Sequence, residues 1–68
     1  MTERLANRIK IERERTGLTQ AALAELVGVS RKTINTVENG VFTPSATLAI
    51  KLSRALELSV EQLFWIDR

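Results

Sequence analysis

Apolar residues recur along this chain at the three- and four-residue spacing of amphipathic helices. They form short groups, and turn-forming residues separate one group from the next, at Gly17, Gly28, Gly40 and Pro44. Val, Ile and Thr nowhere alternate over the length of a strand, so we expect no strands beyond at most a pair at the chain ends. The pattern predicts five short helices, at about 2–16, 19–27, 30–39, 45–56 and 59–64.

Side chains suited to helix capping stand at most of the predicted starts. Thr19, Ser30 and Ser45 each precede a helical group, where a hydroxyl accepts a hydrogen bond from a free amide of the first turn. Ser59 followed by Gln62 has the spacing of a capping box. We expect an all-α fold in a single domain, 1–68. The expected core consists of the apolar helix faces: Leu5, Ile9, Leu18, Leu23, Val27, Val29, Ile34, Val37, Leu48, Leu52, Leu56 and Leu63.

The composition argues against an enzyme. The 68 residues include no cysteine, which excludes a disulfide and a thiolate metal site. They include no histidine, which removes the usual general base and the commonest metal ligand. Carboxylates, hydroxyls and lysines remain, in a body too small for a deep pocket. We therefore expect no enzymatic activity, no metal, no cofactor and no small-molecule ligand.

Charge and hydropathy favour a cytoplasmic protein that tolerates an anionic partner. Ten Lys and Arg against eight Asp and Glu give a net charge of +2, which permits such a partner without requiring it. No apolar run approaches the roughly 18 residues of a membrane span. Residues 1–10 lack the apolar stretch of an export signal. We therefore expect no membrane association.

Only Gly28 and Val29 separate the second predicted helix from the third. Gly28 is expected to make a sharp turn with a positive φ, which glycine adopts at low cost. Apolar residues on both helices, such as Leu23 and Ile34, would seal them against each other. Two helices joined at a steep angle by a minimal turn form a helix-turn-helix, here at about 20–39.

The third predicted helix has two faces of different composition. At about 100° per residue, Ile34, Val37 and Glu38 point to one side. The other side, its flanks and the first turn carry basic, amide and hydroxyl side chains and no acid: Arg31, Lys32, Thr33, Asn35, Thr36 and Asn39. In the major groove of DNA, Arg and Lys donate to guanine, Asn pairs with adenine, and Thr methyls contact thymine. This face is therefore typical of a helix that reads double-stranded DNA.

Four stretches of sequence strengthen this interpretation. They are Gly-Leu-Thr-Gln at 17–20, Leu-Ala-Glu-Leu-Val-Gly-Val-Ser at 23–30, Val-Glu-Asn-Gly at 37–40 and Pro-Ser at 44–45. In this order they resemble the pattern of the phage Cro and repressor (Xre-type) helix-turn-helix family, over nearly the whole chain. The resemblance implies a five-helix, lambda-repressor-like DNA-binding domain that usually acts as a dimer on a palindromic operator.

The resemblance also implies roles for individual residues. The positions that match base-reading residues are Arg31, Lys32, Asn35 and Thr36. The positions that match phosphate-contacting residues are Gln20, Thr33, Asn39 and Gly40, and the position of Gln20 also braces the recognition helix. Arg13 matches an arginine that pairs with the acid at Glu38, and the inward direction of Glu38 independently calls for a cation. Plain surface charges at Arg31 and Lys32, and a solvated Asn35, are the alternatives.

The end of the chain, 60–68, is more apolar than a small monomer needs. Leu63 has a place in the core. The next three residues are also apolar, and one short helix cannot bury all of them: Phe64, Trp65 and Ile66. An exposed apolar cluster favours an interface, so we expect a homodimer contact here. The alternative is that Trp65 folds back on the first helix and covers Ile11.

Two classes of function fit these features. The first is a sequence-specific DNA-binding repressor or autoregulator, which binds duplex DNA as a dimer on a palindrome. The second is a protein-binding module, such as the antitoxin of a toxin–antitoxin pair. A second chain encoded beside this one, or a partner that co-purifies with it, would distinguish the two.

Overall fold

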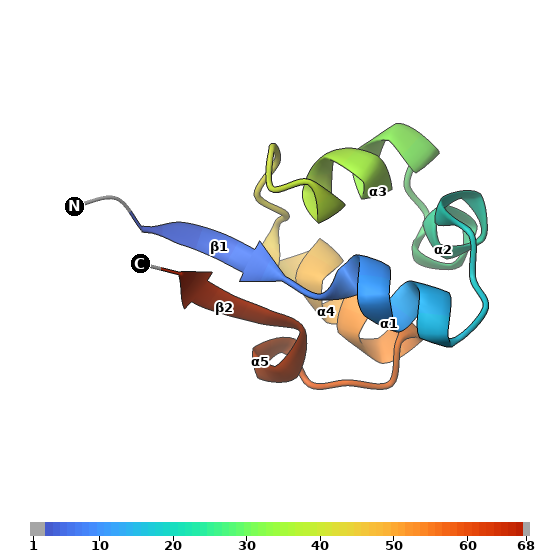
Figure 1. Ribbon diagram of the computed structural model, residues 1–68. Helices are drawn as coiled ribbons and strands as arrows, with labels where there is room; N and C mark the ends of the chain where they lie inside the picture. The colour runs from blue at the N-terminus through green and yellow to red at the C-terminus, as the bar shows by residue number, and fades with distance from the viewer. Residues whose placement is uncertain (1–2, 68) are drawn as a thin grey trace.

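The structure, a computed structural model, describes residues 3–67. This part of the chain contains five helices and two short strands, joined by turns and loops (Figure 1). In chain order the elements are β1 (Arg4–Asn7), α1 (Ile9–Arg15), α2 (Gln20–Val27), α3 (Arg31–Glu38), α4 (Ala46–Ala55), α5 (Val60–Leu63) and β2 (Phe64–Asp67). The expected start of the first helix, at Thr2, and the last residue of the expected contact region, Arg68, lie outside the described residues.

The all-α expectation is overstated at the chain ends, where the structure contains the one pair of strands that the sequence pattern allowed. β1 and β2 pair antiparallel, with Leu5 opposite Ile66 and Ala6 opposite Trp65, and the resulting ribbon projects from the helices (Figure 1). α1 therefore begins at Ile9 instead of near residue 2. The four-residue spacing of Leu5 and Ile9 fits a helix, but pairing with a segment from the other end of the chain overrides that local preference.

The predicted helix starts are otherwise confirmed. The hydroxyls of Thr19, Ser30 and Ser45 accept from amides in the first turns of α2, α3 and α4, at 3.0, 3.1 and 3.1 Å. Ser59 and Gln62 form the capping box at the start of α5. None of the helices within residues 3–67 has the length and apolar character needed to span a bilayer.

The core lies where the helices meet and extends under the ribbon. Its buried members are Ile9, Leu23, Ala24, Val27, Ile34, Val37, Leu48, Leu52, Leu56, Leu63 and Phe64. Three expected core residues, Leu5, Leu18 and Val29, are partly buried and pack against this cluster. Ala24 and Phe64 join the core in addition to the expected set. The inner faces of the helices are thus assigned correctly by the sequence pattern.

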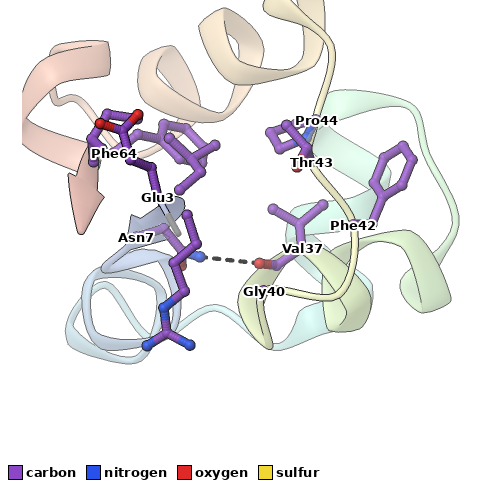
Figure 2. A pocket seen from close by; sticks show the side chains of 11 residues that line it. Glu3, Asn7, Val37, Gly40, Phe42, Thr43, Pro44 and Phe64 are labelled. Atoms are coloured by element: carbon purple, nitrogen blue, oxygen red, sulfur yellow. Dashed lines mark hydrogen bonds between the residues drawn. The ribbon is translucent and has the colours of Figure 1, made fainter. Parts of the chain in front are cut away.

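Asn7 fastens the ribbon to the helices. Its side-chain oxygen accepts from the amide of Ile9 at 3.0 Å, which satisfies one of the free amides at the start of α1. Its side-chain nitrogen donates to the carbonyl of Val37 at 3.0 Å, near the end of α3 (Figure 2). One amide side chain therefore ties the entry of α1 to the exit of α3.

The turn between α2 and α3 depends on the backbone freedom of Gly28, which has φ +76° in the left-handed region. A Cβ at this position would meet no atom within 4 Å, so only backbone strain opposes a side chain. We expect Gly28→Ala to lower the free energy of unfolding by about 1–2 kcal/mol. Gly28→Asn should cost less, because asparagine tolerates this region. Urea unfolding measures both, and equal losses would contradict the backbone explanation.

Candidate nucleic-acid interface

α2 and α3 form the expected helix-turn-helix. α2 ends at Val27, Gly28 turns the chain, and Ser30 caps α3, so only Val29 lies between the turn and the cap. Leu23 and Ile34, from the facing sides of the two helices, are both fully buried. Because the inner side of α3 is fixed by this packing, its opposite side must face outward.

The outer side of α3 carries the side chains expected there. Arg31, Lys32 and Asn35 are exposed, whereas Thr33 and Thr36 are half-buried. The three exposed side chains join Gln20, the first residue of α2, in lining one shallow depression. The structure therefore brings residues from both helices of the motif to one surface.

Within residues 3–67, neither Arg31 nor Lys32 forms a salt bridge. The only acid of α3, Glu38, is turned to the opposite side, where its carboxylate meets Arg13. The donors of Arg31 and Lys32 are thus available to an external acceptor. Three further side chains are partly committed. Thr36 Oγ1 donates to the carbonyl of Thr33 at 2.9 Å, Asn39 Nδ2 donates to Asn35 Oδ1 at 3.3 Å, and the hydroxyls of Thr33 and Ser30 share a hydrogen bond of 3.0 Å.

Arg13 and Glu38 form a buried ion pair beneath this surface. Arg13 Nε donates to Glu38 Oε2 at 2.7 Å and Nη2 donates to Oε1 at 3.2 Å, and the two side chains are only 9% and 3% exposed. Arg13 Nη1 also donates to the carbonyl of Leu18 at 2.9 Å. The hydrogen bond to Glu38 raises the pKa of Arg13, while burial opposes the rise. Arg13 therefore stays charged at every physiological pH and joins α1, the following turn and α3.

Gln20 is attached to the same carboxylate. Its Nε2 donates to Glu38 Oε1 at 3.1 Å, so the start of α2 is held against the end of α3. One side-chain oxygen and one N–H of Gln20 remain for an external partner. The family resemblance implies that Gln20 braces the recognition helix, and the bond to Glu38, which joins residues 18 positions apart, is a contact of that kind.

The turn after α3 is internally hydrogen-bonded. The amides of Asn39 and Gly40 donate to the carbonyls of Asn35 and Val37, both at 3.1 Å. The amide of Val41 donates to the carbonyl of Thr36 at 2.9 Å. A phosphate at this turn would therefore find the side chain of Asn39 and the unsubstituted Cα of Gly40, because the backbone N–H groups already have acceptors.

The three apolar residues at the chain end lie in different environments. Phe64 is 6% exposed and belongs to the core, so its side chain is not available at the surface. Trp65 and Ile66 are 41% and 54% exposed. Successive strand residues point to opposite faces, so these two neighbours do not share a surface. The Arg8 guanidinium lies 5.4 Å from the centre of the Trp65 ring, while Ile11 stays 66% exposed.

Comparison with known proteins agrees with this geometry. The helix-turn-helix family model HTH_3 matches residues 9–63. The HTH-type transcriptional regulator YgzD of Bacillus subtilis is 38% identical over 63 residues, 93% of this chain and 96% of that protein. The P22 c2 repressor, in a crystal structure with a synthetic operator, superposes with a TM-score of 0.77 and 35% identity, covering 79% of this chain and 82% of that one. The antitoxin HipB of Escherichia coli K12 is 38% identical over 56 residues, 82% of this chain and 64% of that protein.

Proposed function

We propose, from the premise that this chain belongs to the HTH_3 family of helix-turn-helix DNA-binding regulators, that it represses transcription by inserting α3 into the major groove of a specific operator. One observation carries the proposal above all others. The outer side of α3 presents Arg31 and Lys32, which form no salt bridge with any residue that the structure describes, and the one acid in the sequence of α3 is turned inward to Arg13. A face of donors without a carboxylate fits the acceptor-rich edge of guanine and the negative charge of DNA.

The depression between α2 and α3 suggests which groups read bases. Arg31 and Lys32 donate to guanine O6 and N7, since their long side chains extend from the first turn of α3. Asn35 faces an adenine, with its nitrogen as the freer group because its oxygen accepts from Asn39. Thr36 offers its methyl group to thymine, because its hydroxyl already donates within the helix.

Phosphate contacts flank these base contacts and orient the helix. One side-chain N–H of Gln20 donates to Glu38 and the other is left for a phosphate. The same side chain therefore positions α3 and binds the DNA backbone. Thr33 offers to a phosphate the remaining hydrogen-bonding capacity of a hydroxyl that it shares with Ser30 Oγ, and the turn at Asn39 and Gly40 approaches the DNA backbone at the other end of the helix. Such contacts fix the register of α3 without carrying sequence information.

A homodimer on a palindrome completes the proposal. One recognition helix reads only a few base pairs, and two helices related by a two-fold axis read half-sites about 34 Å apart. The exposed part of the chain end, Trp65 and Ile66, is the proposed region of contact. The P22 c2 repressor, whose structure contains a synthetic operator, supports the binding of operator DNA by similarity, and the two-fold arrangement is part of the proposal.

Selection of bound sites from random duplexes tests the proposal directly. We expect enrichment of one palindromic sequence whose half-sites are one helical turn apart. Affinity for that sequence should fall steeply as salt rises, because cationic contacts release condensed counterions. Recovery of no preferred sequence would contradict sequence-specific repression, and a preferred sequence without two-fold symmetry would contradict the dimer.

Substitution of the two basic residues tests the assignment of base contacts. We expect Arg31→Ala and Lys32→Ala each to reduce discrimination against a mismatched base pair by about 1–3 kcal/mol, because each removes a base-edge donor. Lys10→Ala, an exposed lysine on α1, is the matched control and should leave discrimination unchanged. Titrations of operator and mismatched duplexes at fixed salt measure the difference. Equal weakening on every sequence would reassign the residue to phosphate binding.

The similarity to HipB favours one second candidate, the antitoxin of a toxin–antitoxin pair. In that role the chain would hold a partner protein in addition to DNA. Co-expression with the product of the adjacent gene, followed by purification of this chain, distinguishes the candidates. A stoichiometric complex that suppresses a toxic activity would favour the antitoxin, and specific DNA binding without any such complex would favour the autonomous repressor.

A further inference from the structure

A hollow of about 290 Å³, here called the α4 hollow, lies where α3, α4 and the end of α2 meet. Apolar side chains make up most of its lining, among them Val29 from the turn between α2 and α3 and Phe42 from the segment after α3. Polar side chains line it as well, with Thr33 from α3 and both Thr47 and Lys51 from α4. Thr33 is one of the proposed phosphate contacts, so the α4 hollow continues the proposed DNA-binding surface.

The α4 hollow and the depression beside Gln20 lie on opposite flanks of the reading side of α3. At about 100° per residue, Thr33 lies about 100° around the helix from Lys32 in one direction, and Asn35 lies about 60° from it in the other. Asn35 shares the depression with Gln20, whereas Thr33 belongs to the α4 hollow. A helix that lies in the major groove has a sugar-phosphate backbone on each side. The two sites therefore face different strands of the duplex.

The α4 hollow contains a cation that the proposed phosphate contacts lack. Those contacts are all neutral residues: Gln20, Thr33, Asn39 and Gly40. Lys51 is exposed and forms no salt bridge with any residue among 3–67. Thr47 precedes Lys51 by four positions, so the two side chains lie on one face of α4. The hollow thus places an unpaired ammonium group and an exposed hydroxyl beside Thr33.

The charge of the α4 hollow favours DNA as its occupant. Among the residues that the structure describes, no acid lines it, and its one cation is Lys51. Lys51 also borders a second hollow between α2 and α4, which is different in character because Glu25 lines it together with Arg54. A backbone strand that reaches Thr33 therefore meets positive charge without a competing carboxylate.

We propose that one backbone strand of the operator lies in the α4 hollow, with a phosphate held by Lys51 and the adjoining deoxyribose packed on Phe42. This contact rests on the proposed function and adds α4 to the DNA-binding surface. Lys51 supplies the charge, and the hydroxyls of Thr33 and Thr47 supply neutral donors in the same hollow. Because all of these groups contact the backbone, they add affinity and fix the position of α3 without reading sequence.

Phe42 forms a fixed apolar wall of the α4 hollow. Its side chain is half-exposed, but the backbone is held, because the amides of Val41 and Phe42 both donate to the carbonyl of Thr36, at 2.9 and 3.2 Å. In Figure 2 the ring points away from Asn7 and Phe64, to the outside of the segment that follows α3. Packing of a deoxyribose on this ring removes apolar area from water, which is favourable and independent of charge.

The salt dependence of operator binding tests the role of Lys51. A neutralised phosphate contributes about 0.9 to the slope of log K against log salt concentration, so we expect Lys51→Ala to lower that slope by about 1 and to weaken operator and mismatched duplexes equally. Lys51→Arg keeps the charge and should keep the slope. Arg54→Ala is the matched control, because it removes an exposed cation from the same helix outside the α4 hollow, and it should leave the slope unchanged. Equal slopes for Lys51→Ala and Arg54→Ala would overturn the contact.

Operator duplexes that each carry one methylphosphonate, an uncharged replacement for a phosphate, locate the contact. We expect one position to weaken binding of the wild-type chain about fivefold and binding of Lys51→Ala less than about twofold, because the variant has already lost the charge that the phosphate attracts. Arg54→Ala should keep the wild-type pattern. If Lys51→Ala stays sensitive at every position that affects the wild-type chain, Lys51 holds no phosphate.

Phe42→Ala tests the apolar half of the contact. We expect it to weaken all duplexes about threefold at every salt concentration while the salt slope stays at the wild-type value, because an apolar contact releases no counterions. Phe42→Leu keeps an apolar wall and should lose less affinity. Thermal melting checks the fold of both variants. Unchanged affinity for Phe42→Ala, or a changed slope, would contradict the contact with deoxyribose.

Failure of this contact and failure of the proposed function give different results. If the wild-type chain selects an operator but Lys51→Ala binds it with the wild-type slope, the α4 contact is wrong and α3 remains the reading helix. If the wild-type chain prefers no sequence, the proposed function and the α4 contact fail together. If Lys51→Ala loses discrimination between operator and mismatched duplexes, Lys51 contacts a base and its assignment to the backbone is wrong.

Discussion

Arg13→Met is expected to lower the free energy of unfolding by about 3–5 kcal/mol, because it strands the Glu38 carboxylate, 3% exposed, without its cation. It also removes the donor to the carbonyl of Leu18. A single core in a chain this small rarely supplies more than about 3–5 kcal/mol, so the variant should be largely unfolded at 25 °C. Thermal or urea unfolding followed by circular dichroism measures the loss.

The neighbouring Arg15 offers a matched control on the same helix. It contacts Glu12 at 2.6 Å, and although the Glu12 side chain is only 12% exposed, the Arg15 side chain is 64% exposed, so water already solvates the arginine charge. Arg15→Met should therefore change stability by no more than about 1 kcal/mol. Adding Glu38→Gln to Arg13→Met removes the stranded charge and should recover part of the loss. Similar losses for Arg13→Met and Arg15→Met would show that burial does not determine the strength of this pair.

Local signals account for the parts of the fold that were predicted. Helix caps depend on a residue and the amides two or three positions later, so Thr19, Ser30 and Ser45 could be assigned from sequence. Helical periodicity predicts which side of α3 is buried, and it places Ile34 inside and Lys32 outside. The inward direction of Glu38 follows in the same way and calls for a cation, which the family resemblance identifies as Arg13.

Contacts between distant segments account for what was missed. β1 and β2 bring the two ends of the chain together, and neither strand is long enough to show an alternating pattern. The same pairing turns Trp65 and Ile66 to opposite faces, whereas a helical tail would have suggested one joint surface. The link from Asn7 to Val37 likewise depends on packing that only the folded chain defines. For Gln20, the resemblance implied a brace of the recognition helix, and only the folded chain shows that Glu38 is its partner.

Ile34→Ala is the second large effect, expected to cost about 2–5 kcal/mol of stability, because Ile34 is fully buried and its truncation leaves a cavity under α3. Ile34→Val removes one methylene from the same site and should cost only about 0.5–1.5 kcal/mol. Urea unfolding compares the two, and a loss below 1 kcal/mol for Ile34→Ala would show that α3 is not anchored through this residue.

The contrast between the two faces of α3 links this stability loss to function. Lys32→Ala lies on the exposed side and should change stability by no more than about 0.5 kcal/mol while it weakens operator discrimination. Ile34→Ala should behave in the opposite way, since the groups that bind DNA remain and only their support is weakened. Operator at 100 times its dissociation constant stabilises the folded form by about 2.7 kcal/mol. Excess operator should therefore restore the helical signal of Ile34→Ala, and a mismatched duplex at the same concentration should not.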